Sequence, residues 1–187
     1  MRELSLHILD LVQNSIEAGA TTVILEIMED TRDDQLVIRI SDNGRGMEPA
    51  ILDQVTDPFV TTRTTRKVGL GLPLIDMSTK RCEGELTIRS VAGEGTVVEA
   101  RYRHGHWDRP PLGDMVETLK SIIIANPSLD FRYSHSFNDA VFRLETVEIT
   151  GILGDIPLTH PEVLEWLDGY LRSNYANLYG GVPYENS

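Results

Sequence analysis

Apolar residues near the start of the chain recur every three or four positions, as they do along one face of a helix. Between residues 3 and 18 they occupy one arc at about 100° per residue, and they are Leu4, Ile8, Leu11, Val12 and Ile16. Gly19 follows directly, and glycine is common just beyond a helix C-terminus. The pattern predicts a helix over 3–18.

Short runs rich in β-branched residues come next. Residues 23–28 and 36–41 predict two strands, and the charged turn 29–34 between them favours a hairpin. Further elements are expected in the following order: a short helix over 49–56, a loop over 58–69, a helix over 71–82, and a second hairpin of strands 85–90 and 96–102. This order of helices and hairpins predicts an α+β fold.

A break in the pattern divides the chain. Pro110 and Pro111 cannot continue a helix or a central strand, so we place a linker at 105–111, between a domain at 1–104 and a small α/β domain at 112–187. The elements expected in the second domain are a helix over 113–125, strands over 129–134 and 141–149, and a helix over 162–175. Thr159 and Glu162 have the spacing of a capping box at the start of the last helix.

Composition and charge narrow the function classes. With 17 basic and 29 acidic residues among 187, the formal net charge is −12, which disfavours nucleic acid and anionic membranes as partners. Cys82 is the only cysteine, which excludes an intrachain disulfide and suits a reducing compartment. No apolar run approaches the roughly 18 residues of a membrane span. We therefore expect a cytoplasmic protein.

The face of the first helix opposite the apolar arc carries side-chain oxygens. Asp10, Asn14 and Glu17 stand at i, i+4 and i+7 and so share that face. An amide between carboxylates offers the hard oxygen ligands that Mg²⁺ prefers, and a carboxylate one turn earlier can orient a hydroxyl for attack on phosphate. The alternative is the solvated face of an ordinary surface helix.

A glycine-rich turn, Asp42-Asn43-Gly44-Arg45-Gly46-Met47, follows the second predicted strand. Its glycines permit positive φ and the close approach of a flat ligand, and its aspartate can accept a hydrogen bond from an exocyclic amine. The alternative is a plain turn, because Asn-Gly and Asp are common turn formers.

Residues 57–71 hold the densest basic cluster of this acidic chain. The cations are Arg63, Arg66 and Lys67. Gly69 and Gly71 then lead into the next predicted helix, whose first amides favour anions, so the segment has a phosphate-binding composition. The alternative is a cationic surface loop without a ligand. The glycine spacings of dinucleotide-binding folds and of P-loops are both absent.

Together these segments resemble the GHKL ATPase superfamily, which contains histidine kinases, anti-sigma-factor serine kinases, type II topoisomerases, heat-shock chaperones and mismatch-repair ATPases. The boxes follow in family order over residues 1–104: 10–18 as the N box, 42–47 as the G1 box, Asp57-Pro-Phe59 with Thr61-Thr62 as the F box, Gly69-Leu70-Gly71-Leu72 as the G2 box, and Gly93-Glu94-Gly95-Thr96. An ordered series is far more specific than one box.

The resemblance implies a fold and a role for individual residues. The fold would be a two-layer α/β sandwich of the Bergerat type, with helices on one face of a mixed sheet. Asn14 would coordinate Mg²⁺, Asp42 would bond the adenine amine, and Thr96 would support Asp42. Further contacts to ATP are expected from Gly44, Gly46, Met47, Phe59, Arg63, Arg66, Lys67, Gly69, Leu70, Gly71 and Leu72.

Asp10 would be the catalytic residue that this resemblance implies. It stands where ATP-hydrolysing members and the serine kinases have a glutamate as general base, and an aspartate is shorter by one methylene. ATP binding is therefore better supported than catalysis.

The segment between the F and G2 boxes is short, as in the histidine-kinase and anti-sigma branch, and does not fit a DNA clamp. We expect a Mg-ATP module that phosphorylates or regulates a partner protein in signalling, in the manner of anti-sigma serine kinases. One alternative is a nucleotide-switched protein-binding module without phosphotransfer. Another is a slow ATPase coupled to closure of a homodimer.

Overall fold

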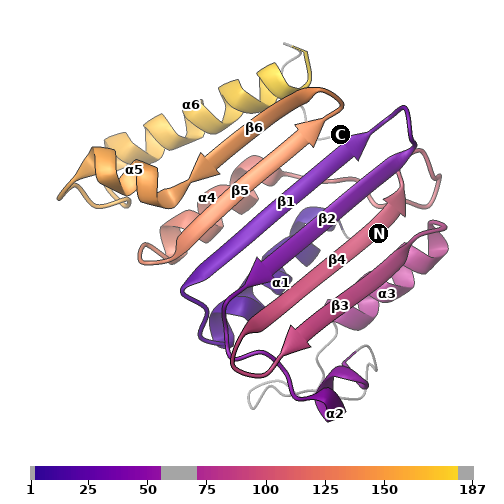
Figure 1. Ribbon diagram of the computed structural model, residues 1–187. Helices are drawn as coiled ribbons and strands as arrows, with labels where there is room; N and C mark the ends of the chain where they lie inside the picture. Colours follow the sequence, from indigo (N-terminus) through magenta and orange to yellow (C-terminus); the bar gives the residue numbers. More distant parts are fainter. Residues whose placement is uncertain (1–2, 56–70, 181–187) are drawn as a thin grey trace.

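A single mixed sheet organises the chain (Figure 1). The computed structural model describes residues 3–55 and 71–180. Its strands are β1 (Thr22–Asp30), β2 (Gln35–Asp42), β3 (Glu85–Val91), β4 (Gly95–Arg103), β5 (Asp130–Phe137) and β6 (Ala140–Glu145). Their order across the sheet is β3-β4-β2-β1-β5-β6, with β1 parallel to β5 and every other neighbouring pair antiparallel.

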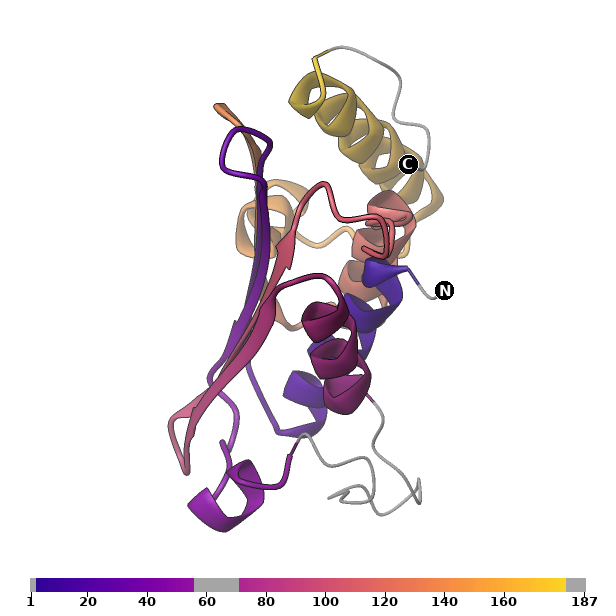
Figure 2. The ribbon, with the colours of Figure 1, turned by 90° about the vertical axis from the view of Figure 1, so that its right-hand side faces the viewer.

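The longest helices all cover one face of this sheet (Figure 2). The helices of the described residues are α1 (Leu4–Glu17), α2 (Pro49–Leu52), α3 (Gly71–Arg81), α4 (Met115–Ala125), α5 (Thr146–Leu153) and α6 (Pro161–Leu178). None of them is long and apolar enough to cross a bilayer. The expected α+β class, a mixed sheet with helices on one face, is confirmed.

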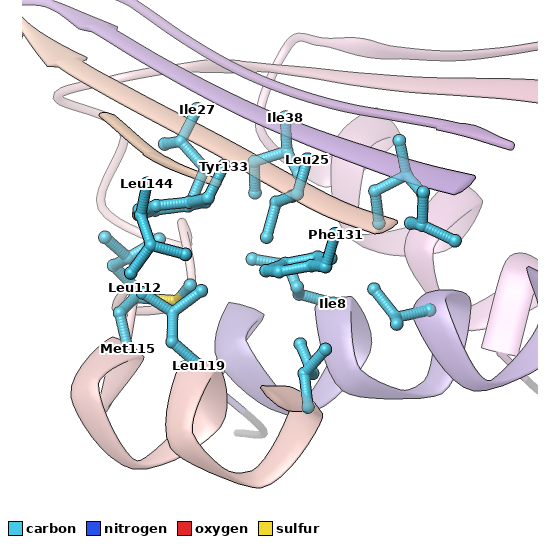
Figure 3. Packing of buried hydrophobic residues seen from close by; sticks show 14 of the residues in the cluster. Ile8, Leu25, Ile27, Ile38, Leu112, Met115, Leu119, Phe131, Tyr133 and Leu144 are labelled. Atoms are coloured by element: carbon cyan, nitrogen blue, oxygen red, sulfur yellow. The ribbon is translucent and has the colours of Figure 1, made fainter. Parts of the chain in front are cut away.

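Alternation along the strands decides which side chains meet the helices. On β1, Val23, Leu25 and Ile27 are buried, whereas the residues between them are more exposed. Figure 3 shows Leu25 packing in one layer with Ile8 of α1 and Phe131 of β5. Burying a side chain of this size stabilises a fold by about 1.5–3 kcal/mol. The layer therefore fixes α1 against the centre of the sheet.

A separate C-terminal domain is not confirmed, because the two parts of the chain share this sheet and one hydrophobic core. β5 pairs with β1 from Thr22 opposite Asp130 onward. The predicted linker also contacts α1, since the carbonyl of Pro111 accepts a hydrogen bond of 2.9 Å from the Leu4 amide. Parallel pairing between strands so distant in sequence leaves no local signal, which is why the break at 105–111 suggested two domains.

Three local predictions were wrong. Glu29 was assigned to a turn but lies in β1, where it is buried. The strand expected over 141–149 ends at Glu145, and α5 begins with Thr146, whose hydroxyl donates to the Leu129 carbonyl (2.8 Å) and turns the chain back toward β5. The residue before α6 is His160, with no side-chain capping bond, so the capping box expected from Thr159 is absent.

Candidate functional site

The Asp42 carboxylate lies at the end of β2, half-buried beneath α1. The Ser15 hydroxyl on α1 donates a hydrogen bond of 2.7 Å to Asp42 Oδ2. The backbone amide of Gly44 donates one of 2.9 Å to Oδ1. These two short donors fix the plane of the carboxylate, and within residues 3–55 and 71–180 they leave further lone pairs on both oxygens for a ligand.

The turn that follows Asp42 is tied to its surroundings by its own side chains and amides. Asn43 Oδ1 accepts from the backbone amides of Thr21 and Thr22, both at 2.9 Å. Gly46 has φ of 63°, and a Cβ there would collide with the Val91 carbonyl, so only glycine fits without displacing the β3–β4 hairpin. The turn is therefore a fixed shape rather than a loose connection.

The β3–β4 hairpin closes the other side of this turn. Thr96 stands directly opposite Asp42 in the β2–β4 register. Its hydroxyl lies 2.9 Å from that of Ser90, and Ser90 also accepts a hydrogen bond of 2.8 Å from the Met47 amide. The structure thus brings Asp42, Met47 and Thr96 together, as expected, with Ser90 as the connecting group.

The polar arc of α1 meets the first residue of α3. A Cβ built on Gly71 would collide with the Asp10 carboxylate and would lie 3.8 Å from Asn14 Nδ2. Both α1 side chains therefore face the amino end of α3, where the helix dipole favours negative charge. Only glycine at position 71 allows this approach. Leu72, the next residue of α3, packs partly buried against the core.

Several expected ligand contacts lie outside the described residues. They are Phe59, Arg63, Arg66, Lys67, Gly69 and Leu70. Their roles, and the basic composition of their segment, stay predictions from the sequence. The site residues that are described come from α1, the turn after β2, β4 and the start of α3.

Sequence reasoning missed three residues that hold the site together: Ser15, Asn43 and Ser90. Ser15 follows Asn14 directly, and a polar residue at the boundary of an apolar arc was a usable signal. Asn43 was read only as a turn former, and Ser90 only as part of a strand. Asn43 bonds Thr22, 21 positions away, and Ser90 bonds Met47, 43 positions away. Spacing along the sequence alone could not reveal such contacts.

The donor set near Asn14 fits a magnesium ion that shares its coordination with a ligand. The amide oxygen of Asn14 and the carboxylate of Asp10 are hard oxygen donors on one face of one helix. Within residues 3–55 and 71–180, no group of three or more His, Cys, Asp or Glu residues could hold a metal by itself. Mg²⁺ typically takes one or two protein oxygens and completes its shell with phosphates and water.

One known protein family matches the part of the chain that contains the described site residues. The family described as histidine kinase-, DNA gyrase B-, and HSP90-like ATPase matches residues 2–105, which is more than half of the 187 residues. All the site residues described above fall inside this range.

Two curated relatives are sensor or sporulation kinases. The sensor protein kinase FleS of Pseudomonas aeruginosa is 40% identical over 89 residues, covering 48% of this chain and 22% of FleS. Sporulation kinase C of Bacillus subtilis is 34% identical over 91 residues, covering 49% of this chain and 21% of the kinase. The chain thus matches only about a fifth of the length of these relatives.

One solved structure shares the fold at low sequence identity. The N-terminal domain of a DNA repair protein superposes with a TM-score of 0.51 and 16% identity, over 78% of this chain and 52% of that one. The matched share of this chain extends beyond residue 105, because it is larger than the family match alone.

Proposed function

We propose that this chain, which belongs to the histidine kinase-, DNA gyrase B- and HSP90-like ATPase family, binds Mg-ATP and uses it to phosphorylate or regulate a partner protein in signalling. The kinase relatives support the signalling context. The sequence resemblance suggests the anti-sigma serine kinases as a functional analogy.

The observation that carries the proposal is the approach of Asp10 and Asn14 to Gly71. A carboxylate, a side-chain amide and the amino end of a helix lie together at Gly71. A bound triphosphate needs a metal ligand, a base and anion-binding amides at one place. Asp42, held by Ser15 and Gly44, supplies a second, separate point of recognition. The pair of points suits a ligand with a flat base at one end and phosphates at the other.

Each described residue then has a chemical task. The Asp42 carboxylate accepts a hydrogen bond from the adenine amine, and Thr96 supports the carboxylate from β4. Gly44 and Gly46 shape the turn beside the ring by letting the turn pack closely on Ala18 and on the Val91 carbonyl. Gly71 opens the amino end of α3 to the phosphates. Asn14 would hold Mg²⁺, which when bound would offset the negative charge of the phosphates.

Asp10 is the proposed base. It accepts the proton of an attacking hydroxyl as the hydroxyl oxygen bonds to the γ-phosphorus and the bond to the leaving ADP breaks. Because the Asp10 carboxylate packs against Gly71, it already lies at the amino end of α3, beside the proposed phosphate position.

A nucleotide-switched binding module is the second candidate, and the length of Asp10 favours it. An aspartate reaches less far than the glutamate found at this position in hydrolysing members, so Asp10 can help position metal without serving as a base. In this case ATP binding changes the association with a partner, and no phosphoryl group is transferred.

The substitution Asp10→Asn separates the two candidates. Calorimetry with a non-hydrolysable ATP analogue should give an affinity within about threefold of the original, because the side chain keeps its size. Radiolabel transfer from ATP to protein should be abolished if Asp10 is the base. If the partner still associates in a nucleotide-dependent way and the original protein transfers no label, the second candidate stands.

The metal assignment has its own test. Asn14→Ala should weaken Mg-ATP binding far more than binding of ATP in EDTA, since only the first requires the ligand. Equal losses would exclude Asn14 as a metal ligand. Absence of any heat of binding for the original protein would overturn the whole proposal.

A further inference from the structure

Helix α5, the connection after it and the first turns of α6 expose large apolar side chains. These residues are between 47% and 83% exposed: Val147, Ile152, Ile156 and Trp166. We call them, with the acidic residues around them, the α5 surface. Scattered apolar residues are common on protein surfaces, but here four large ones fall within twenty consecutive positions of the chain.

Exposed acidic side chains alternate along the chain with these apolar residues. The exposed acids of the segment are Glu145, Glu148, Asp155, Glu162 and Glu165. No lysine or arginine occurs between Arg143 and Arg172, although the whole chain has 17 of them. Arg132 of β5 lies opposite Glu145, but the segment from Leu144 to Leu171 itself carries acidic side chains and no lysine or arginine, so its own charge is negative.

The segment that carries the α5 surface is anchored to the core, so its exposed side chains have fixed positions. Ile149, Leu158 and Val163 are each less than 10% exposed and join the core. The Thr146 hydroxyl accepts from the Phe131 amide at 2.9 Å, which pins the start of α5 to β5. Trp166 stacks on Tyr170 with ring centroids 5.2 Å apart.

The α5 surface lies at the same end of the sheet as the proposed nucleotide site. Register places Glu145 opposite Arg132, Arg132 opposite Ile24, and Ile24 opposite Ser41, the neighbour of Asp42. Three strand spacings separate β6 from β2, or about 14 Å. In Figure 1 the start of α5 and the end of β2 lie along one edge of the sheet.

We propose that the α5 surface binds a segment of a partner protein that presents apolar anchors flanked by lysine or arginine. Apolar contact would supply affinity, and the acidic rim would supply orientation and rejection of acidic segments. A second copy of this chain fits poorly, because a symmetric contact would set the acidic rims against each other. Anionic lipid and nucleic acid are repelled for the same reason.

A segment bound here would bring its protein within reach of the phosphates of a bound nucleotide. In this one respect the inference rests on the proposed function, because it assumes that the nucleotide binds near Asp42. Docking itself needs no nucleotide. An experiment without ATP therefore fails separately from the nucleotide-binding assays above.

The test uses Trp166 as a reporter on the full chain. The sequence contains two tryptophans, and Trp107→Phe removes the other, which is 98% exposed. In this background we titrate a synthetic amphipathic helix of about 18 residues, with leucines on one face and lysines on the other. A matched peptide carries glutamates in place of the lysines.

We expect the lysine peptide to shift Trp166 emission to shorter wavelength and to bind at least about tenfold more tightly than the glutamate peptide, with affinity falling as salt rises. Ile152→Asp should weaken the lysine peptide by about tenfold, because Ile152 is the most exposed of the apolar set. Met77→Asp, at an exposed residue of α3, is the control and should have no effect.

Four outcomes would overturn the inference. They are equal binding of the two peptides, equal losses for the Ile152 and Met77 variants, binding to phosphatidylserine vesicles that Ile152→Asp removes, and self-association in sedimentation equilibrium that the same substitution abolishes. The last two would assign the surface to a membrane and to a second copy of the chain.

Discussion

Two carboxylates at opposite ends of the β1–β2 hairpin differ in how they are held. Glu29 is the next-to-last residue of β1 and is surrounded by partners. His135 Nε2 lies 2.9 Å from its Oε1, the Tyr179 hydroxyl donates to the same oxygen at 2.5 Å, and His104 Nε2 lies 3.1 Å from Oε2. Asp42 ends β2 and is half-buried, and among the described residues its carboxylate has two short donors, from Ser15 and Gly44.

The difference separates a carboxylate that joins parts of the fold from one that can serve a ligand. The partners of Glu29 come from β5, from the residue directly after α6 and from the segment after β4, so this cluster ties the C-terminal part of the chain to β1. Tyr133 and Tyr175 extend the cluster on the far side of His135. Asp42 is also held by two donors but is only half-buried, and partial exposure is the condition for recognising a base.

The largest effect on stability is expected at Glu29, at the end of the hairpin where the carboxylate is buried. Glu29→Gln keeps the size of the side chain but removes the charge that two histidines and a tyrosine surround. Removing one partner of a buried charged cluster costs about 3–5 kcal/mol, to be measured as the free energy of unfolding in urea. ATP-analogue affinity below the unfolding transition should not change.

The control for that variant is Glu26→Gln, on the same strand but on the open face of the sheet. Glu26 lies 3.7 Å from Arg39 and its side chain is 36% exposed. Such a pair contributes at most about 1 kcal/mol. Equal losses from the two substitutions would show that the cluster around Glu29 is not special.

The same cluster predicts a pH dependence. Burial alone would raise the pKa of Glu29, but hydrogen bonds from His135 and Tyr179 outweigh it and lower the pKa from 4.5 to about 2. A lowered pKa in the folded state stabilises the protein above pH 4.5, and this stabilisation is lost as pH falls toward 2. A shift of this size corresponds to roughly 3 kcal/mol.

Unfolding free energies of the original protein and of Glu29→Gln, measured from pH 6 to pH 2.5, test this. The two curves should approach each other as the pH falls, because protonation removes what the variant lacks. Curves that stay parallel would contradict a lowered pKa for Glu29.

At Asp42, the half-buried carboxylate at the other end of the hairpin, the expected loss is in ligand affinity and not in stability. Asp42→Asn replaces an ionised acceptor, and a hydrogen bond to a charged group contributes about 1.5–3 kcal/mol. ATP-analogue affinity should therefore fall by about 10- to 100-fold, with discrimination between ATP and GTP reduced, as calorimetry would measure. Unchanged discrimination would remove Asp42 from base recognition.

The same contrast explains what the sequence could predict. The two hairpins and the helices that became α1 and α3 follow from local periodicity, and the polar arc of α1 was correctly read as one face of a helix. The Asp42 turn was recognisable because its glycines are a local signal. Local features of this kind need no knowledge of distant partners.

Glu29 shows what local patterns miss. Between Met28 and Asp30 it reads as the start of a charged turn, and its burial depends on His135 and Tyr179, residues 106 and 150 positions away. The joining of β5 to β1 has the same cause, since parallel pairing is decided by packing over the whole sheet. The break in pattern at 105–111 marks a change of direction, and the sheet continues across it.

The smallest expected effect, that of Ser15→Ala, tests most directly how Asp42 is held. Ser15→Ala removes one of the two donors that fix Asp42, so the carboxylate keeps its charge but loses part of its orientation. A single hydrogen bond of this kind contributes about 1 kcal/mol, so ATP-analogue affinity should fall by about fivefold. Ser5→Ala is the matched control, because Ser5 is also buried on α1 but its hydroxyl lies 3.4 Å from Glu3 Oε2, remote from Asp42. If both substitutions weaken binding equally, α1 acts through its general stability. If only Ser15→Ala does so, Ser15 positions Asp42, and the open end of the hairpin is organised for a ligand.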